Sequence, residues 1–172
     1  RIYLRVEKLD NFLKMWTIKK QLAFRTSIIN ISKVTLKQKI HAHYTQQIQD
    51  KEDAFRDMIA ALTEDSKNDA KGSAGDKHET TLSMMHIEQE KLNRKLAEIL
   101  EQKAVLAKIN PDADSGKIAL GSLAEVNNLL LFVSAALTKI TVDGLTIIAV
   151  SPQSPLGSQL MGNTTGFVFE IN

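Results

Sequence analysis

The chain has 172 residues, of which 22 are Lys or Arg and 20 are Asp or Glu, so its formal net charge is +2. Apolar residues make up 43% and charged residues 24% of it, which are ordinary values for a globular protein. The near balance of charge gives no general affinity for nucleic acid. The sequence has no cysteine, which excludes disulfides, thiolate metal sites and thiol nucleophiles.

The sequence also bears on the compartment. No stretch approaches the roughly 18 consecutive apolar residues that a membrane span requires. No segment of residues 1–34 combines a compact apolar core with a small-residue cleavage site, so no signal peptide is evident. We therefore expect a cytoplasmic protein that does not contact a membrane.

Residues 1–34 are the least specified part of the sequence, because they show no steady period of apolar residues. Two interpretations stay open: a poorly ordered extension ahead of the first domain, and an amphipathic segment that docks on a partner. We expect the first domain to begin near Val34–Thr35. The apolar side chains of the docking interpretation are Phe12, Leu13, Trp16, Leu22 and Phe24.

Two long segments, residues 37–63 and 81–109, each carry apolar residues at heptad spacing. Such a narrow apolar stripe is typical of the seam of a two-helix coiled coil rather than of a helix on a globular core. The expected seam positions are Tyr44, Ile48, Phe55, Met58 and Leu62 in the first segment, with Lys51 as a polar break, and Leu82, Met85, Leu92, Leu96, Ile99 and Leu106 in the second.

The polar connection between the two segments, residues 64–77, contains Gly72 and Gly75 and is predicted to reverse the chain. Matched heptads on both sides of this connection favour an antiparallel hairpin of one chain, over residues 35–110, rather than a dimer seam. We therefore expect a monomer. Arms of about 27 residues, at 1.5 Å per residue, give a hairpin roughly 40 Å long.

Two carboxylates, those of Asp76 and Glu79, lie at the tip of this expected hairpin. Mg²⁺ commonly takes one or two protein carboxylates beside substrate phosphates, so the tip could deliver ligands to a metal held by another molecule. The alternative is helix capping, because acids in a first turn complement the helix dipole and an Asp followed three residues later by Glu resembles a capping box. Residue chemistry alone favours capping, and the two roles are compatible.

From Asn110 onward the pattern changes to short β-like runs that follow a linker at residues 111–116. Asp143-Gly144 predicts a type I′ hairpin. Ser154 as cap and Pro155 at the first position predict a short helix over Leu156–Met161, which Gly162 terminates. We expect an α+β protein, with the helical hairpin followed by a small antiparallel sheet and one short helix over residues 111–172. The expected strands are Lys117–Leu123, Leu129–Val133, Leu137–Val142, Leu145–Val150 and Phe167–Ile171.

Two segments resemble a known family. Gly75-Asp76-Lys77-His78-Glu79 resembles the Gly-Asp-x-x-Glu tip of the Gre-type transcript cleavage factors (GreA- and GreB-like proteins) of bacterial RNA polymerase. Residues 154–166 are similar to the Ser-Pro-(Ile/Leu)-(Ala/Gly)-x-x-Leu-(Ile/Leu)-Gly segment of that family's FKBP-like C-terminal domain. The resemblance covers residues 34–172 in the same order and spacing. It implies a coiled-coil hairpin followed by an FKBP-like domain that continues past Asn172.

The resemblance implies a transcription elongation factor whose hairpin enters the secondary channel of RNA polymerase. Asp76 would be the main ligand of a second Mg²⁺ held jointly with the polymerase, and none would be bound by the free protein. Glu79 would support the metal or the water that cleaves the 3′ end of backtracked RNA. A second metal clamps the attacking and leaving oxygens of such a displacement, and a nearby carboxylate can accept the water's proton. The chain would activate the polymerase's own cleavage rather than be an enzyme by itself.

The resemblance also implies that the FKBP-like domain grips the channel rim, with Ser154, Pro155, Leu156 and Gly157 as partner-binding residues. Nothing in the sequence indicates prolyl isomerase activity. The family tip continues Asn-Ala-Glu-Tyr after its Glu, whereas this chain reads Thr80-Thr81-Leu82-Ser83 and so lacks an acid and an aromatic residue. Two alternatives therefore stay open: a channel-binding regulator that does not cleave RNA, and a coiled-coil adaptor unrelated to polymerase.

Overall fold

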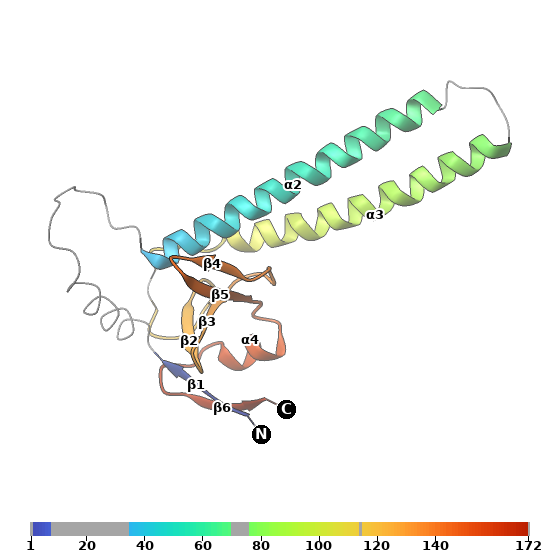
Figure 1. Cartoon of the computed structure of the whole chain (residues 1–172). Coiled ribbons are helices and arrows are strands. Elements are labelled where there is room, and N and C mark those ends of the chain that lie inside the picture. Colours follow the sequence, from blue (N-terminus) through green and yellow to red (C-terminus); the bar gives the residue numbers. More distant parts are fainter. Residues whose placement is uncertain (1, 8–34, 70–75, 114, 172) are drawn as a thin grey trace, which may run out of the picture. The chain divides into compact units, whose positions relative to one another are not determined.

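The structure, a computed structural model, describes residues 2–7, 35–69, 76–113 and 115–171 (Figure 1). It is of the α+β class, as predicted: it combines two long helices with a small mixed sheet and a short helix. The chain divides into two compact units, one of Arg1–His43 with Leu106–Asn172 and the other of Tyr44–Val105. The elements in chain order are β1 (Ile2–Glu7), α2 (Leu36–Asp69), α3 (Asp76–Ala107), β2 (Leu123–Val126), β3 (Leu129–Val133), β4 (Ile140–Val142), β5 (Leu145–Val150), α4 (Pro155–Leu160) and β6 (Val168–Ile171).

Helix α2 begins with a reciprocal pair of hydrogen bonds. The Gln38 backbone N–H donates to Thr35 Oγ1 at 3.2 Å, and the Thr35 backbone N–H donates to Gln38 Oε1 at 2.6 Å. This arrangement is a capping box, which satisfies backbone donors that a helix N-terminus otherwise leaves without partners. It explains why the helix begins at Leu36, next to the expected start of the domain.

In the Tyr44–Val105 unit, the side chains withdrawn from solvent follow the expected heptad spacing on both helices. One expected seam residue was wrong: Met58 is 46% exposed, and Ile59 is withdrawn instead. The reason is spacing, since steps of four and three residues lead from Phe55 through Ile59 to Leu62 and leave Met58 on the neighbouring face. The withdrawn side chains are Ile48, Glu52, Phe55, Ile59 and Leu62 of α2, and Leu82, Met85, Gln89, Leu92, Leu96, Ile99 and Lys103 of α3.

The sheet has six strands in the order β4-β5-β3-β2-β1-β6. The predicted hairpin at Asp143-Gly144 is confirmed: β4 and β5 pair antiparallel, and the two turn residues have φ of 51° and 80°. Asn127 and Asn128 form an equivalent turn between β2 and β3, with φ of 49° and 64°. Positive φ at both positions is the mark of a type I′ turn, and Asn tolerates it better than most residues.

The expected wholly antiparallel sheet was wrong, because β3 and β5 pair in parallel. After the Asp143-Gly144 turn, β5 lies between β4, which is at the edge of the sheet, and β3. The edge of β5 that does not pair with β4 pairs with β3, and these two strands run in the same direction, with Leu130 opposite Ile147 and Val133 opposite Val150. Both strands are almost continuously apolar, as suits strands buried on two faces.

Several predicted boundaries also differ. Residues 117–122 form no strand but an irregular segment with a turn at Leu120-Gly121, where Gly121 has a φ of 83°, and β4 begins only at Ile140. Helix α4 ends at Leu160, one residue early, and β6 begins at Val168, one residue late.

The N-terminal segment holds a strand that the sequence analysis did not predict. β1 lies inside the sheet, where it pairs antiparallel with both β2 and β6. The docking interpretation of the rest of this segment concerns Phe12, Leu13, Trp16, Leu22 and Phe24, which lie outside the described residues.

Helix α4 closes one face of the sheet (Figure 1). Leu160, which is fully buried, joins an apolar cluster with strand residues, and Leu156 packs against the same cluster. Sequence and packing agree here, since these two residues are four positions apart and share a helix face. The other members of the cluster are Ile118, Ala124, Val126, Leu131, Val133 and Val150.

Candidate functional site

The predicted carboxylates lie in the first turn of α3. The helix begins at Asp76, and Glu79 follows three residues later. The side chains of both lie outside the part of the chain that the structure describes, so their roles as Mg²⁺ ligands, as cleavage carboxylates or as caps stay predictions. Within residues 2–7, 35–69, 76–113 and 115–171, no group of three or more His, Asp or Glu side chains is arranged to hold a metal ion.

Two side-chain hydrogen bonds define how α2 and α3 are aligned. Gln89 Nε2 donates to Thr63 Oγ1 at 2.9 Å, and Lys103 Nζ donates to Gln49 Oε1 at 2.7 Å. Fourteen residues forward along α2, from Gln49 to Thr63, therefore correspond to fourteen residues back along α3, from Lys103 to Gln89. In this unit the helices run antiparallel.

This alignment leaves the start of α3 beyond the end of α2. Asp69, the last residue of α2, lies six residues after Thr63, whereas Asp76 lies thirteen residues before Gln89. Helix α3 therefore extends about two turns, or roughly 10 Å, past its neighbour. Figure 1 shows this extension. The first turn of α3 thus lies past the level of Asp69, the last described residue of α2.

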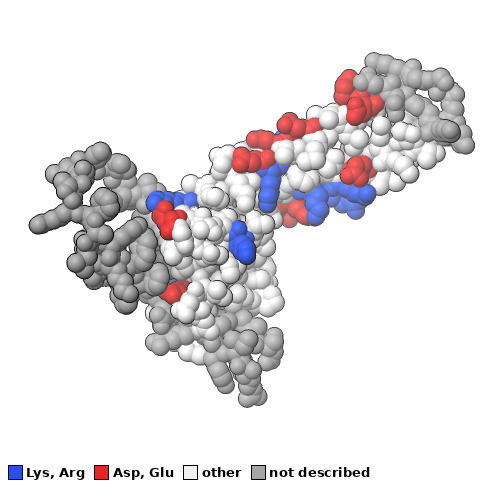
Figure 2. Space-filling model, in the orientation of Figure 1, with Lys and Arg blue, Asp and Glu red and all other residues white. Residues whose placement is uncertain are grey.

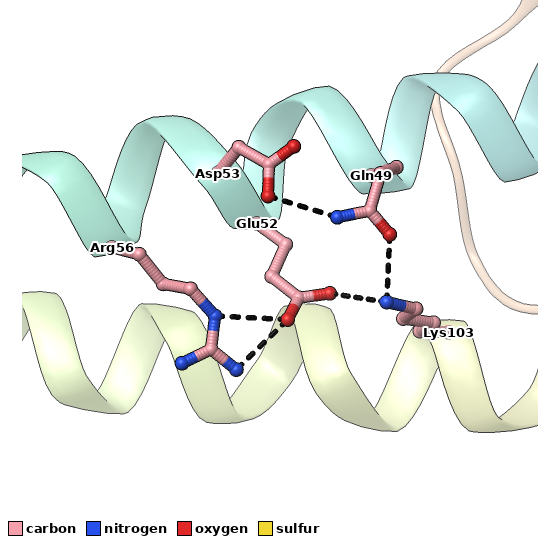
Figure 3. Close-up of polar contacts among 5 residues, drawn as sticks. All are labelled: Gln49, Glu52, Asp53, Arg56 and Lys103. Carbon is pink, nitrogen blue, oxygen red and sulfur yellow. Dashed lines mark hydrogen bonds and ion pairs between the residues drawn. The ribbon is translucent and has the colours of Figure 1, made fainter.

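A buried carboxylate, that of Glu52, lies in the seam between the helices (Figure 3). Its Oε2 accepts a hydrogen bond from Lys103 Nζ at 2.6 Å. Its Oε1 accepts from Arg56, from Nε at 2.9 Å and from Nη2 at 2.8 Å. Gln49 completes the cluster, since it accepts from Lys103 and donates to Asp53 Oδ1 at 2.9 Å. We call Glu52, Arg56, Lys103 and Gln49 the Glu52 layer.

The Glu52 layer holds its carboxylate in the ionised form. The hydrogen bond from Lys103, and then that from Arg56, lowers the pKa of Glu52 below the ordinary range of a glutamate, against the opposing effect of burial. Both carboxylate oxygens are paired, so neither is left as a buried acceptor without a hydrogen bond. An ionised, doubly paired carboxylate is neither a ready proton donor nor an open metal ligand, and the layer is therefore structural.

The predicted partner-binding residues, Ser154 to Gly157, build the first turn of α4. Ser154 Oγ accepts from the Gly157 backbone N–H at 3.0 Å and donates to the Ser151 carbonyl at 2.7 Å. A Cβ on Gly157 would lie 1.9 Å from that same Ser151 oxygen, so no other residue fits there without a shift of backbone. Pro155 is the exposed member. The local fold accounts for Ser154 and Gly157, and binding of polymerase by the four residues stays a prediction.

The sequence analysis missed Glu52. It assigned the polar break of the first seam to Lys51, which is only half-buried, whereas Glu52 is 6% exposed. A signal was available: Glu52 lies four residues after Ile48 and three before Phe55, which is the alternating step of a seam. An opposite charge at Lys103, on the α3 seam, completes that signal.

The outer face of α2 is acidic. Asp50, Asp57 and Glu64 recur every seven residues, Asp53 lies between the first two, and all four are exposed. Figure 2 shows acidic side chains gathered over α2 and side chains of both charges over α3. A face of this kind repels the phosphates of a nucleic acid. The exposed basic residues that the structure describes on α3 are Lys91, Arg94 and Lys95, and the exposed acids Glu88, Glu90 and Glu98 lie among them.

Comparison with protein-family models, with curated proteins and with solved structures finds no match to this chain. The resemblance to the Gre-type factors therefore rests on the residues quoted for it. Among the described residues, no helix combines the length and the apolar character needed to cross a membrane.

Proposed function

We propose that this chain is a bacterial transcription elongation factor of the Gre type. In this proposal α2 and α3 form a coiled-coil hairpin that enters the secondary channel of RNA polymerase and stimulates Mg²⁺-dependent cleavage of backtracked RNA. The observation that carries it is the extension of α3 about two turns past α2, with Asp76 as its first residue.

The donor set suits the metal. Mg²⁺ keeps several waters and takes one or two carboxylates beside phosphate oxygens, and Asp76 with Glu79 supplies two carboxylates in one helical turn. The polymerase would supply the remaining ligands. The ion, when bound, stabilises charge on the oxygens of the scissile phosphate. Asp76 would hold it, and Glu79 would orient the water or accept its proton.

The charge of α2 supports a protein partner rather than direct binding to RNA. The exposed acids of its outer face, Asp50, Asp57 and Glu64, would repel a phosphate backbone. Attachment would then fall to the sheet domain, which we propose to be FKBP-like and to grip the channel rim around Ser154, Pro155, Leu156 and Gly157.

The experiment that tests this function is a pull-down with core RNA polymerase, followed by a cleavage assay on a stalled, backtracked complex. We expect the chain to bind the core enzyme and to shorten the RNA from its 3′ end in the presence of Mg²⁺. The absence of binding would overturn both polymerase proposals and favour a coiled-coil adaptor.

A second function, a channel-binding regulator that does not cleave RNA, is favoured by one observation. After its first Glu, the family tip continues Asn-Ala-Glu-Tyr. In this chain Thr80 and Thr81 stand at the Asn and Ala positions, and Leu82 and Ser83 stand where the family has the second Glu and the Tyr. This regulator would change initiation and leave backtracked RNA intact. Binding of polymerase without RNA cleavage would identify it, and cleavage would exclude it.

A further inference from the structure

The Glu52 layer is a charged cluster within an apolar seam. Its neighbours along the α2 seam are Ile48 and Phe55, and Ile99 is buried on α3. Burying a carboxylate in such surroundings is costly unless it is paired and hydrogen-bonded. The groups around it are Gln49, Asp53 and Arg56 of its own helix and Lys103 of α3, as Figure 3 shows. Lys103 is thus the one contact of Glu52 from the opposite helix among those drawn.

That cross-helix contact exists in one alignment only. A shift of one heptad in one direction places Leu96 of α3 opposite Glu52, and a shift in the other direction places position 110, beyond the end of α3, there. Either shift leaves Glu52 without Lys103. The second polar pair behaves in the same way, since Thr63 would face Leu82 or Leu96 instead of Gln89. A parallel pairing of two α2 helices would bring two Glu52 carboxylates together.

Apolar heptads alone do not distinguish the observed alignment of α2 and α3 from one shifted by a heptad. The seam repeats every seven residues on both helices, so a heptad shift still places apolar residues against apolar residues. Polar residues at single seam positions are a known means of specifying alignment and partner number, at a cost in stability. A buried ion pair is often no more stabilising than apolar residues of similar volume.

We propose that the Glu52 layer fixes the alignment of α2 and α3, and thereby how far α3 extends past α2, by excluding heptad-shifted and parallel pairings of these helices. The contact that distinguishes the observed alignment from the shifted ones is the ion pair between Glu52 of α2 and Lys103 of α3. The inference does not depend on the proposed function, because it concerns the two helices alone.

The absence of cysteine makes the alignment directly measurable by cross-linking in the full chain. Thr63→Cys with Gln89→Cys reports the observed alignment. Thr63→Cys with Leu82→Cys, or with Leu96→Cys, reports the two heptad shifts. These changes also remove the Thr63–Gln89 hydrogen bond, while the Glu52 layer and the contact of the His41 ring with the Leu106 carbonyl oxygen at 3.0 Å remain. A short bis-maleimide reagent links the cysteines, and mass spectrometry identifies the linked pairs.

With the layer intact, we expect links only for the Thr63→Cys, Gln89→Cys pair. In the Glu52→Leu, Lys103→Leu background, links to position 82 or 96 should rise at least several-fold, while the melting temperature should stay the same or increase. The single change Thr63→Cys should in that background give more chain-to-chain links between the two copies of position 63.

The matched control removes an exposed ion pair from α3, by Lys95→Gln with Glu98→Gln. These side chains are each 60% exposed and lie outside the seam, with Lys95 Nζ 2.9 Å from Glu98 Oε2. The control should keep the link pattern of the unaltered chain. If the leucine background also keeps that pattern, the apolar heptads alone set the alignment and the proposal is wrong.

A second background guards against misfolding. Glu52→Gln with Lys103→Gln keeps side chains of similar size without charge, and it should also allow shifted links. Unfolding of both altered backgrounds would overturn the proposal, because the layer would then be required for stability rather than for alignment.

Discussion

At the scale of single residues, the turn before α4 leaves no room for a side chain at Gly157. The Ser151 carbonyl oxygen accepts the Ser154 hydroxyl at 2.7 Å and would lie 1.9 Å from a Cβ on Gly157. Moving it to make room for a side chain would break the cap. The sequence predicted Ser154 as the cap of this helix, and the structure confirms it with the bond from the Gly157 N–H.

Gly157→Ala should therefore lower the free energy of unfolding by about 1–3 kcal/mol, the usual cost of overpacking. Urea titration followed by circular dichroism measures this. The control is Gly116→Ala, since a Cβ on Gly116 would meet nothing within 4 Å. Equal stability of the two variants would contradict this description of the turn.

Glu52 makes the stability of the chain depend on pH. Its pKa in the folded chain is lowered, chiefly by Lys103, so its contribution is fully present above the pKa of the unfolded chain and is lost as the pH falls through the folded value. The free energy of unfolding should thus decline below about pH 5. Glu52→Gln should make that decline shallower, as measured by urea titrations at several pH values. An unchanged slope would show that Glu52 is not a source of the acid sensitivity.

At the scale of elements, the sequence predicted what depends on local pattern. Heptad spacing located both long helices, and Asp143-Gly144 located the β4–β5 hairpin. The Glu52 layer was missed because the polar break was assigned to Lys51, although the step of four residues from Ile48 and of three to Phe55 falls on Glu52. The parallel contact of β3 with β5 was missed because turn residues fix only neighbours along the chain. β1 pairs with strands more than a hundred residues away, and no local signal specifies such a contact.

The turn at Asn127-Asn128 provides a test at this scale. Asn128 is exposed and has a φ of 64°, a conformation that glycine adopts freely and that a β-branched residue strongly disfavours. Asn128→Gly should keep or raise the melting temperature, and Asn128→Val should lower the stability by about 1–2 kcal/mol. Calorimetry of the two variants checks this. A valine variant as stable as the glycine variant would contradict the type I′ assignment.

At the scale of the whole molecule, the account expects a monomer. Within the Tyr44–Val105 unit the heptad side chains of α2 and α3 are withdrawn from solvent, and its buried apolar residues are Tyr44, Ile48 and Ile99. No second copy is needed to cover that seam. Sedimentation equilibrium should give the mass of one chain, 19.1 kDa, and a concentration-dependent dimer would contradict this.

The site is less determined by the sequence than the fold is. The position of Asp76 as the first residue of α3 agrees with its expected place after the glycine-containing connection. What its carboxylate binds depends on a partner, and neither the helix nor the sheet domain specifies that partner. The Gre-type resemblance supplies the hypothesis, and an assay of RNA cleavage in a complex with RNA polymerase tests it.

The most direct test is the rate of Mg²⁺-dependent RNA cleavage in a backtracked polymerase complex, with the unaltered chain, Asp76→Ala and the control Asp57→Ala. Asp57 is an exposed acid of α2 away from the extension of α3. Loss of a first-turn acid should cost at most about 0.5–2 kcal/mol of stability. Loss of a metal ligand should slow cleavage tenfold for about each 1.36 kcal/mol of transition-state stabilisation removed.

The account predicts that Asp76→Ala abolishes cleavage while binding to polymerase is kept, that Glu79→Ala shows a smaller loss, and that Asp57→Ala cleaves normally. Cleavage by Asp76→Ala and Glu79→Ala at the unaltered rate would contradict it.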